Sequence, residues 1–482
     1  MEKYNITLVK LDNVWGKLIT DDPHILEAAV RKFAVKVDNF WFMPAYKAGR
    51  WDGKIKFVQP DGKFYVGIFK KVLHYVKDDN LYNIEIDPGF LNEEETGVFK
   101  ERFLENISNL EYPFEPRSYQ LRGALKSSFY KRGICEHVTS SGKSFTICLT
   151  IHHLLQDNPD HRVIILVPKI DLVEQFVENL EEYGIPTDLV GKYCGYQKDE
   201  DAQIVVSTWQ SVYKKKAFLR NFNVLIVDEC HGLKADEVRG VAEKAINADT
   251  RLGFTGTMPA PQCEYMLIQG VLGPVIDEVD YEELQKAKQI AQIKINIVQC
   301  NYNEQIILEN EEEDFTSEKT RVETDVKRNK IICRIAKEYT DKGKNALILV
   351  KKLDHIQDIK DIMEKAGVNY FVVTGETKVK DRNHARHEVE KSGGNVIIAT
   401  TGVYSTGVSI KRLHCVLFAS PGKSKIQTLQ SVGRGLRLHD TKSHLHLYDV
   451  CENLKFSKKH LKERLKYYKK AKFDYNIKEV SM

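Results

Sequence analysis

The sequence Thr139-Ser140-Ser141-Gly142-Lys143-Ser144 separates two apolar runs of different character. Residues 134–138, before it, have the pattern of a buried strand, and residues 145–155, after it, have the pattern of a helix. A Gly-Lys-Ser sequence at a strand-to-helix turn is suited to phosphate, because backbone N–H groups and the positive end of the helix attract an anion. We predict that Ser140, Ser141 and Gly142 surround phosphate groups, that Lys143 reaches the terminal ones, and that the Ser144 hydroxyl binds Mg²⁺.

One position departs from the usual phosphate-loop pattern, G-x-x-x-x-G-K-[ST]. His137 stands where that pattern begins with glycine. Because backbone N–H groups bind phosphate whatever the side chain, we expect the loop to support hydrolysis, although the histidine leaves its detailed shape open. The alternative is a serine-rich turn that carries a surface lysine.

The overall composition is that of a globular chain. Its 482 residues are enough for about three domains, and 42% of them are hydrophobic. Lys and Arg number 72 against 68 Asp and Glu, and the excess is concentrated in residues 452–482, where ten cations face four acids. Nine scattered cysteines without a C-x-x-C pair predict neither a disulfide framework nor a zinc site. No membrane span or signal peptide is predicted, so we expect the protein in a reducing cytoplasm.

Residues 1–110 are predicted to form a small α+β domain. Two hairpin signals, Trp51-Asp52-Gly53-Lys54 and Pro60-Asp61-Gly62-Lys63, lie between alternating runs, and residues 69–76 have helical spacing. Aromatic and cationic side chains are interleaved between residues 41 and 56. Such a surface is suited to stacking on bases and following a phosphate backbone, with Trp51 and Lys54 among the contacts. Alternatively, the aromatics are the core of the domain and the lysines its wet face.

Two α/β lobes are predicted after this domain. Residues 111–275 alternate apolar strands with helices, which is typical of a doubly wound parallel sheet. Residues 276–330 are expected to be a connector with a solvated face. The alternation resumes in residues 331–452, and residues 453–482 are predicted to be a basic helical tail with one apolar face. The predicted strands are 134–138, 163–167, 204–207, 224–227, 251–254, 346–350, 370–373, 396–399, 415–418 and 446–450.

Asp228 and Glu229 follow the apolar run 224–227, so two adjacent carboxylates stand at the carboxyl end of a predicted strand. Phosphoryl transfer to water uses such a pair, because one carboxylate holds Mg²⁺ and the other orients or deprotonates the water. We assign these roles to Asp228 and Glu229, respectively. Thr255-Gly256-Thr257, after another strand, is predicted to be a hinge-like contact with the other lobe. The alternative for Asp228 and Glu229 is a pair of solvated acids in a turn.

The second lobe contains Gln430-Ser431-Val432-Gly433-Arg434-Gly435-Leu436-Arg437. Arg434 and Arg437 are three residues apart, so both guanidinium groups can project from one helix into one cleft and meet negative charge on a γ-phosphate. Supplied by a separate lobe, they would act as arginine fingers that complete the site, together with Gln430, only when the lobes close. The alternative is a pair of solubilising arginines on an exposed helix.

In this order the motifs resemble those of superfamily-two helicases. They are Tyr119-Gln120, SSGKS (140–144), VPKIDLVEQ (167–175), STWQS (207–211), DECH (228–231), TGT (255–257), TGE (374–376), ATTGVYSTGVSI (399–410) and QSVGRGLR (430–437). More narrowly, the chain is similar to the phage UvsW-type helicases, whose small N-terminal domain has a W-D-G-[KR]-I hairpin, here residues 51–55. The resemblance implies an α/β fold, with two RecA-like parallel-sheet lobes in tandem after a small N-terminal α+β domain.

The resemblance also implies a function. Such an enzyme uses ATP and Mg²⁺ to unwind and anneal DNA and to branch-migrate forks and Holliday junctions in phage recombination and repair. It implies that Gln120, with Arg117, recognises adenine and that Gly407 lies near the ribose. The positions that contact the nucleic-acid backbone in such motors are matched by Lys169, Thr208, Thr374 and Thr400. Phosphate contacts bind any sequence, as a translocating motor requires.

We expect the partners to be branched or double-stranded DNA and single-stranded DNA, and the protein to be a monomer without a membrane contact, in the host cytoplasm if phage-encoded. An RNA helicase, or a motor subunit of a restriction or remodelling complex, is an alternative, although no nuclease-type carboxylate cluster is evident beyond the motor. A nucleic-acid-binding protein whose motor fold has lost catalysis is disfavoured. Every polar and charged part of the motor is present, namely Lys143, Asp228, Glu229, Gln430, Arg434 and Arg437.

Overall fold

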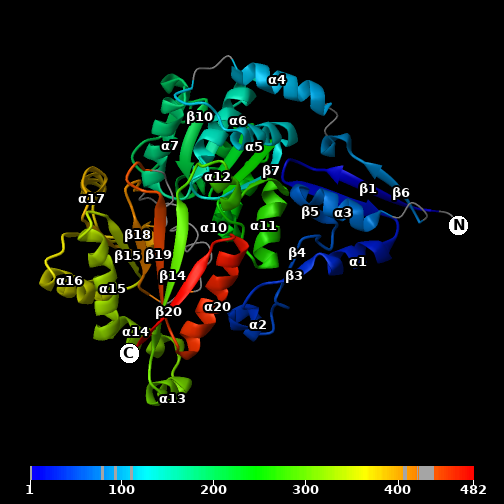
Figure 1. Cartoon of the computed structure of the whole chain (residues 1–482). Helices are drawn as coiled ribbons and strands as arrows, with labels where there is room; N and C mark the ends of the chain where they lie inside the picture. Colours follow the sequence, from blue (N-terminus) through cyan, green and yellow to red (C-terminus); the bar gives the residue numbers. More distant parts are fainter. Residues whose placement is uncertain are drawn as a thin grey trace. The chain divides into compact units, whose positions relative to one another are not determined.

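The computed structural model describes residues 3–77, 81–91, 95–108, 112–404, 410–420, 422 and 439–482. The chain separates into two compact units, Met1–His137 with Gly142–Val279 and Val138–Ser141 with Asp280–Met482. Each unit is built around a seven-stranded sheet, and the first unit also carries a four-stranded N-terminal sheet (Figure 1). No helix in the described ranges has both the length and the apolar character that a membrane span requires.

The N-terminal sheet has the strand order β5-β2-β1-β6. Strand β1 (Tyr4–Lys10) is antiparallel to β2 (Trp15–Thr20) and parallel to β6 (Tyr82–Ile86), and β5 (Lys63–Tyr65) pairs with β2. Helices α1 (Pro23–Lys32) and α3 (Phe69–Val76) cover one face of it. The helix predicted over residues 69–76 is therefore present, and its buried residues join the alternating inward side chains of β1 in one core.

The two hairpin signals have different outcomes. At the second, the backbone N–H of Gln59 donates to the carbonyl of Lys63 at 2.8 Å, so the chain reverses tightly there as predicted. The first is not a tight hairpin. Strand β4 (Lys54–Lys56) pairs with β3 (Ala34–Lys36), and the connection between them is long enough to hold η1 (Phe40–Phe42) and α2 (Pro44–Lys47).

The N-terminal segment shares its core with the first lobe. Helix α11 (Gln262–Leu272) of that lobe contributes Cys263, Met266 and Leu267 to the cluster that also contains Leu8 and Val72. Across the same contact, the Tyr65 hydroxyl donates to Glu243 at 2.6 Å. The two segments therefore share one core and belong to one compact unit.

The first lobe has the strand order β13-β7-β12-β11-β8-β10-β9, and its strands are parallel. They are β7 (Arg132–His137), β8 (Val163–Val167), β9 (Val190–Tyr193), β10 (Ile204–Thr208), β11 (Val224–Asp228), β12 (Thr250–Thr255) and β13 (Val275–Val279). Helices α5 (Ser118–Tyr130), α6 (Lys143–Asp157) and α7 (Ile170–Glu182) pack on one face, and α10 (Asp236–Lys244) and α11 pack on the other. Burial on both faces explains why the central strands β8, β10 and β11 are largely apolar runs.

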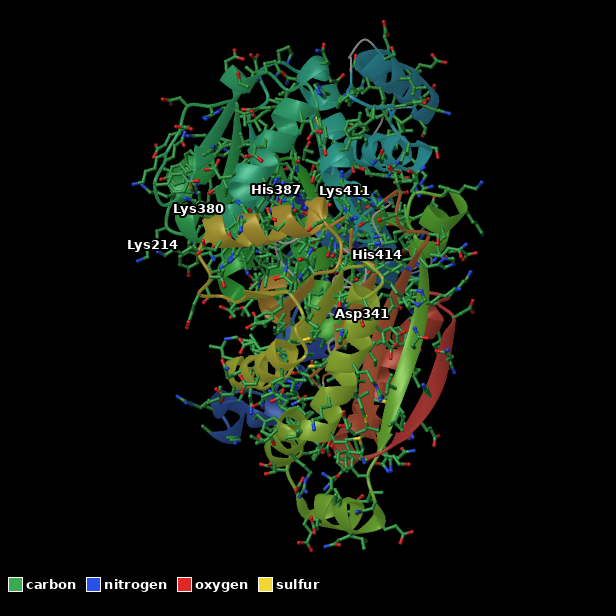
Figure 2. The ribbon with its side chains drawn as sticks, turned by 60° about the vertical axis from the view of Figure 1, so that its left-hand side comes forward. Lys214, Asp341, Lys380, His387, Lys411 and His414 are labelled. Atoms are coloured by element: carbon green, nitrogen blue, oxygen red, sulfur yellow. The ribbon has the colours of Figure 1, made fainter. Side chains whose placement is uncertain are left out.

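The second lobe has the strand order β16-β17-β15-β18-β19-β14-β20, again parallel. Its strands are β14 (Gln292–Asn301), β15 (Ala346–Val350), β16 (Tyr370–Val373), β17 (Val396–Thr400), β18 (Cys415–Phe418), β19 (His444–Glu452) and β20 (Tyr475–Ser481). Helices α15 (Val326–Thr340) and α16 (Leu353–Lys365) bury their apolar sides on it. At the start of β18, Nδ1 of His414, labelled in Figure 2, accepts from the backbone N–H of Asn345 at 3.1 Å. The predicted fold class, with two tandem parallel-sheet lobes, is confirmed.

Two segments differ from expectation. Within the expected connector 276–330, β14 pairs along its length with β19, so this stretch belongs to the second sheet rather than joining the sheets from outside. Within the expected helical tail 453–482, α20 (Lys455–Lys470) is followed by β20, which pairs with β14. The buried face of α20 also includes Arg464, whose guanidinium binds the Asp449 carboxylate at 2.7 and 2.8 Å. The other domain boundaries stay predictions.

Candidate nucleotide-binding site

The phosphate-loop sequence connects the end of β7 to the first residue of α6, as predicted. Gly142 caps the helix in the left-handed region, with φ of +83°. A Cβ atom at this residue would lie 2.4 Å from Gln120 Nε2, so the glycine is required both by its backbone conformation and by the neighbouring amide. The structure therefore brings Gln120 directly against the loop.

The adenine-recognition candidates lie at the beginning of α5. Arg117 precedes this helix, and its backbone N–H donates to Gln120 Oε1 at 3.0 Å. Its guanidinium donates to the Tyr119 hydroxyl at 2.8 Å. Gln120 and Tyr119 are buried, so both side chains are held in place. The local sequence thus forms a compact polar group next to Gly142.

The predicted acid pair lies at the carboxyl end of β11, in the middle of the sheet. Burial raises the pKa of the Asp228 carboxyl, the charge of Glu229 raises it further, and the Lys143 ammonium opposes both. The positive charge of Lys143 thus favours the ionised form of Asp228. Glu229 adopts a left-handed conformation with φ of +50°, an uncommon backbone for a residue other than glycine and one that recurs at functional sites.

A polar contact that the sequence did not predict joins the acid pair to the Thr255-Gly256-Thr257 motif. His231 Nδ1 lies 3.3 Å from Glu229 Oε2 and 3.0 Å from Thr255 Oγ1. Thr255 ends β12, the strand next to β11, so the parallel register places its hydroxyl beside the residues after Asp228. The sequence shows His231 as the last residue of the DECH motif, but its contact with Thr255 depends on which strands are neighbours in the sheet. The Thr255 hydroxyl is thus a contact within this lobe.

The residues of this site fit a magnesium ion bound with a nucleotide. Ser144 and Asp228 offer a hydroxyl and a carboxylate oxygen, the kind of ligand that Mg²⁺ prefers, and phosphate oxygens usually complete its shell. A cation beside Asp228 would also offset the burial that raises the pKa of this carboxyl. Among the described residues no cluster of three or more His, Cys, Asp or Glu side chains offers an alternative metal site.

The predicted backbone-contacting residues lie at the carboxyl ends of neighbouring strands in each lobe. In the first lobe, Lys169 caps α7 after β8, and Thr208 ends β10, which pairs with β8. In the second lobe, Val373 is opposite Ala399, so Thr374 and Thr400 follow adjacent positions. Lys169 is exposed, whereas Thr208 is 6% exposed and its hydroxyl lies 2.9 Å from Ser211 Oγ. Of this pair, Lys169 is the more accessible to a ligand.

Trp51 and Lys54, the predicted DNA-contacting residues of the N-terminal segment, are only partly exposed. Trp51 is half-buried, and its indole N–H donates to the carbonyl of Lys54 at 2.8 Å. More exposed aromatics stand close together on η1 and α2: Trp41 is 50%, Phe42 67% and Tyr46 38% exposed. Lys47 lies 6.0 Å from the Phe42 ring centroid, so cations accompany these rings. We call residues 41, 42 and 46 the aromatic patch.

Four predicted site residues, Gly407, Gln430, Arg434 and Arg437, lie outside the described residues. Their roles stay predictions.

Sequence comparison with protein families finds three matches in chain order. The N-terminal model of DNA helicase UvsW matches residues 9–87, the res subunit of type III restriction enzymes matches residues 105–260, and the helicase conserved C-terminal domain matches residues 327–439. The ATP-dependent DNA helicase uvsW of Enterobacteria phage T4 is 27% identical over 478 residues, which cover 93% of this chain and 94% of that protein.

Solved structures give the same result. The crystal structure of T4 UvsW aligns with a TM-score of 0.52 and 25% identity over 99% of each chain. A type ISP restriction-modification enzyme, LlaBIII, aligns with a TM-score of 0.59 and 13% identity over 86% of this chain and 36% of that one, a likeness of fold alone. With the domain order, the two parallel-sheet lobes and the nucleotide site described above, the chain is a UvsW-type superfamily-two helicase, an enzyme that hydrolyses ATP and binds nucleic acid.

Proposed function

We propose that this helicase is a DNA translocase that acts on branched substrates, migrating forks and four-way junctions by unwinding and annealing, in phage recombination and repair. The observation that carries the proposal is the carboxyl edge of the first sheet, where the loop that ends at Lys143 follows β7, Asp228 ends β11, and Gln120 lies against Gly142. One bound nucleotide could contact all of these groups at once, as ATP hydrolysis requires.

The proposed chemistry assigns each group one role. Ser140, Ser141 and Gly142 surround the phosphates, Lys143 neutralises the terminal ones, and Ser144 and Asp228 hold Mg²⁺, which would stabilise charge on the phosphates. Glu229 orients the attacking water. Arg117 and Gln120 recognise adenine, and Gly407 lies near the ribose. In the second lobe, Arg434 and Arg437, with Gln430, act as the arginine fingers that complete the site.

The proposed DNA contacts come from both lobes and from the N-terminal segment. Lys169, Thr208, Thr374 and Thr400 would contact the backbone of a translocated strand. The aromatic patch, together with Lys54 and Trp51, would contact a duplex arm or an exposed base at the junction, because aromatic rings stack on any base and cations attract phosphate. The exposed lysines of α20 would add a further phosphate contact.

The proposal is tested by Lys143→Ala and Glu229→Gln, assayed for ATPase activity with and without forked DNA. Both variants should lose DNA-stimulated turnover, by about 100-fold or more, and both should still bind a fork. Full turnover in either variant would contradict the assignment of the site. A fork, a four-way junction, single-stranded DNA and a structured RNA, compared as activators, separate a DNA motor from an RNA helicase, which would respond most to the RNA.

We further propose that the protein works as a monomer in a reducing cytoplasm, that of the host if the chain is phage-encoded. All nine cysteines are described, and each is a buried free thiol, which is consistent with such an environment. The sedimentation velocity of the full chain, alone and with a fork, would test the monomer.

A further inference from the structure

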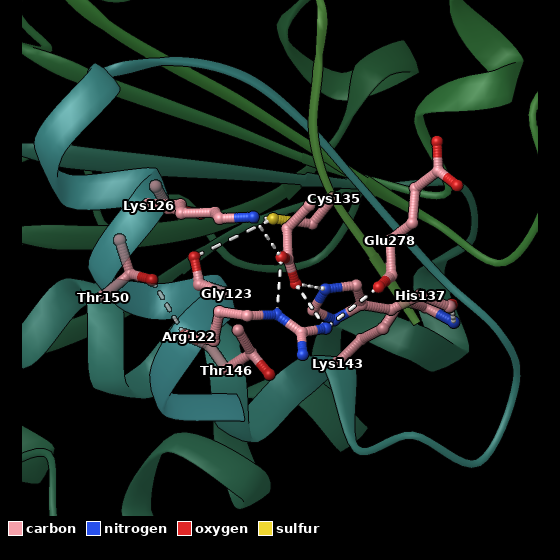
Figure 3. A network of polar contacts seen from close by, with 11 residues as sticks. Arg122, Gly123, Lys126, Cys135, His137, Lys143, Thr146, Thr150 and Glu278 are labelled. Atoms are coloured by element: carbon pink, nitrogen blue, oxygen red, sulfur yellow. Dashed lines mark hydrogen bonds and ion pairs between the residues drawn. The ribbon is translucent and has the colours of Figure 1, made fainter. Parts of the chain in front are cut away.

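His137, the last residue of β7, replaces the first glycine of the usual phosphate-loop pattern, and its side chain is fully buried. Room for the imidazole comes from Gly123 on α5, because a Cβ atom there would lie 2.7 Å from His137 Cε1. Figure 3 shows His137 beside Arg122, Gly123 and Lys126, three residues of that helix. The histidine is therefore accommodated by a specific small residue.

The imidazole is held by a carboxylate from another strand. His137 Nε2 lies 2.9 Å from Oδ2 of Asp277, whose side chain is 1% exposed. Asp277 Oδ1 also accepts from Arg122 Nε at 2.8 Å and from Lys126 Nζ at 2.9 Å. Burial favours a higher pKa for Asp277, but the hydrogen bonds from His137, Arg122 and Lys126 outweigh it and lower the pKa to about 2. Since an ionised carboxylate only accepts, His137 Nε2 is the donor.

An irregularity in β13 places this carboxylate. Val275 is opposite Ile134 of β7, but Asp277 is opposite Cys135, so one extra residue stands between the two pairs. The extra residue turns Asp277 to the face that carries Cys135 and His137. In a regular strand the carboxylate would face the opposite side, where Ile134 lies in an apolar core.

The same histidine contacts the loop lysine through its backbone. Lys143 Nζ donates to the carbonyl oxygen of His137 at 3.3 Å. One residue therefore has its ring fixed by Asp277 and its carbonyl against the ammonium group assigned to the terminal phosphates.

We propose that His137 is a positioning residue of the nucleotide site, and that Asp277 fixes its imidazole so that the phosphate loop leaves β7 on the path that places Lys143. The inference rests on the proposed function. A loop that begins with glycine obtains its path from backbone freedom, whereas here a side-chain clamp sets it. The clamp joins three segments of the site: α5, which begins beside Gln120, the loop itself, and the last strand of the lobe.

The test compares His137→Gly, His137→Gln and Asp277→Asn with a matched control, His152→Gln. His152 is a buried histidine on α6 of the same lobe, with its Nε2 3.2 Å from the carbonyl of Tyr183, away from the loop lysine contact. For each full-length variant, the measurements are the melting temperature, the Kd for a fluorescent ATP analogue with Mg²⁺, and KM and kcat for ATP.

His137→Gly and Asp277→Asn should raise the Kd and KM for nucleotide by about tenfold, with a smaller change in kcat. The first removes the hydrogen bond from the imidazole, and the second removes the negative charge that strengthens the hydrogen bonds from His137, Arg122 and Lys126. His137→Gln should stay within about threefold of the wild type, since its amide N–H can donate to Asp277. His152→Gln should lower the melting temperature and leave the Kd unchanged.

Two outcomes would overturn the inference. One is an unchanged Kd in both His137→Gly and Asp277→Asn, which would make His137 a packing residue. The other is a Kd for His137→Gln as weak as that for His137→Gly. If His137→Gly does not fold, the Kd values of Asp277→Asn and His137→Gln still decide whether the inference holds. The Kd of Lys143→Ala in the same assay distinguishes failure of the inference from failure of the proposed function. A normal Kd in this variant overturns the proposed function. A weaker Kd in this variant, with normal Kd values in His137→Gly and Asp277→Asn, overturns only the inference about His137.

Discussion

Gln120 Nε2 lies so close to Gly142 that a Cβ atom on residue 142 would be 2.4 Å from it. Because Gly142 also has φ of +83°, this position combines a backbone requirement with a steric one. The two residues come from different segments, the first turn of α5 and the N-terminus of α6. Their contact ties the adenine-recognition candidate to the phosphate loop.

We therefore predict that Gly142→Ala impairs nucleotide binding more than it impairs folding. The substitution costs about 1–2 kcal/mol of backbone strain and pushes the Gln120 amide away, so the Kd for a fluorescent ATP analogue should rise at least about tenfold. The matched control is Gly367→Ala, which has φ of +63° and no atom within 4 Å of its Cβ position. A comparable stability loss with normal nucleotide affinity is expected there; equal affinity losses in both variants would count against the contact.

The sequence predicted the strands of both lobes well where they are buried on two faces. Each of the ten predicted runs overlaps an observed strand, and all of them except β16, at the edge of the second sheet, are interior strands, which must be largely apolar. The two missed strands of the second sheet, β14 and β20, do not have this pattern. In β14, Lys294 is exposed and Asn296 is half-buried, and β20 is an edge strand whose residues are mostly exposed. β14 lies between β19 and β20 but alternates buried with exposed residues at its start, and β20 lies at the edge, so neither has the continuous apolar run that predicts a buried strand.

The candidate site divides in the same way. Lys143, Asp228 and Glu229 were predictable because each follows an apolar strand in a local motif. The contacts of Gln120 with Gly142, of His231 with Thr255 and of His137 with Asp277 were not predictable, since each joins segments whose proximity depends on strand order. Arg464 was assigned to a basic tail, but its ion pair with Asp449 buries it. One sequence does not reveal such long-range pairing.

The aromatic patch predicts a specific defect in DNA binding. Replacing Trp41 and Phe42 together by Ala removes two exposed rings, and loss of base stacking costs about 1–3 kcal/mol for each base. We expect the Kd for a fork with unpaired bases at its junction to rise by about tenfold or more, with little change in its salt dependence, because no cation is removed. Fluorescence anisotropy at several salt concentrations would measure both quantities.

The control for this variant is Leu308→Ala, which removes a side chain that is 71% exposed on α13 (Glu304–Glu312). It should bind the fork as the wild type does. If the double variant also binds normally, or if it loses affinity equally for a blunt duplex, the aromatic patch does not stack on bases.

The Asp277 carboxylate predicts a loss of stability in acid. Its pKa is about 2 in the folded protein, below the ordinary value of 3.8, so its contribution is complete above pH 5 and declines as the pH falls toward 2. The full contribution is about 2 kcal/mol, of which about half should be lost at pH 3. Urea unfolding at pH 6 and pH 3 should therefore show a larger difference between wild type and Asp277→Asn at pH 6. Asp160→Asn, in an exposed loop, serves as the control, and a difference that does not narrow in acid would contradict the assignment.

The contact between the N-terminal segment and the first lobe predicts that Gly67→Ala destabilises both together. A Cβ atom at this residue would lie 2.0 Å from the carbonyl oxygen of Gln269 and 2.5 Å from that of Gly270, both in the backbone of α11. Since backbone atoms in a helix do not yield as a side-chain end does, we expect a loss of about 3 kcal/mol and a single unfolding transition at lower temperature.

Gly97→Ala, on α4 (Thr96–Ser108) with no atom within 4 Å of its Cβ position, is the control and should melt at or slightly above the wild-type temperature.

The contact between the N-terminal segment and α11 also affects any deletion of that segment. Deleting residues 1–110 would expose Cys263, Met266 and Leu267 of α11, so a loss of fork binding in that variant would report a damaged lobe as well as a missing DNA contact. Point substitutions in the aromatic patch avoid this ambiguity. A Gly67→Ala protein that melts like the wild type would show that the segment moves independently of the lobe, and fork binding by the deletion variant would then report the DNA contact alone.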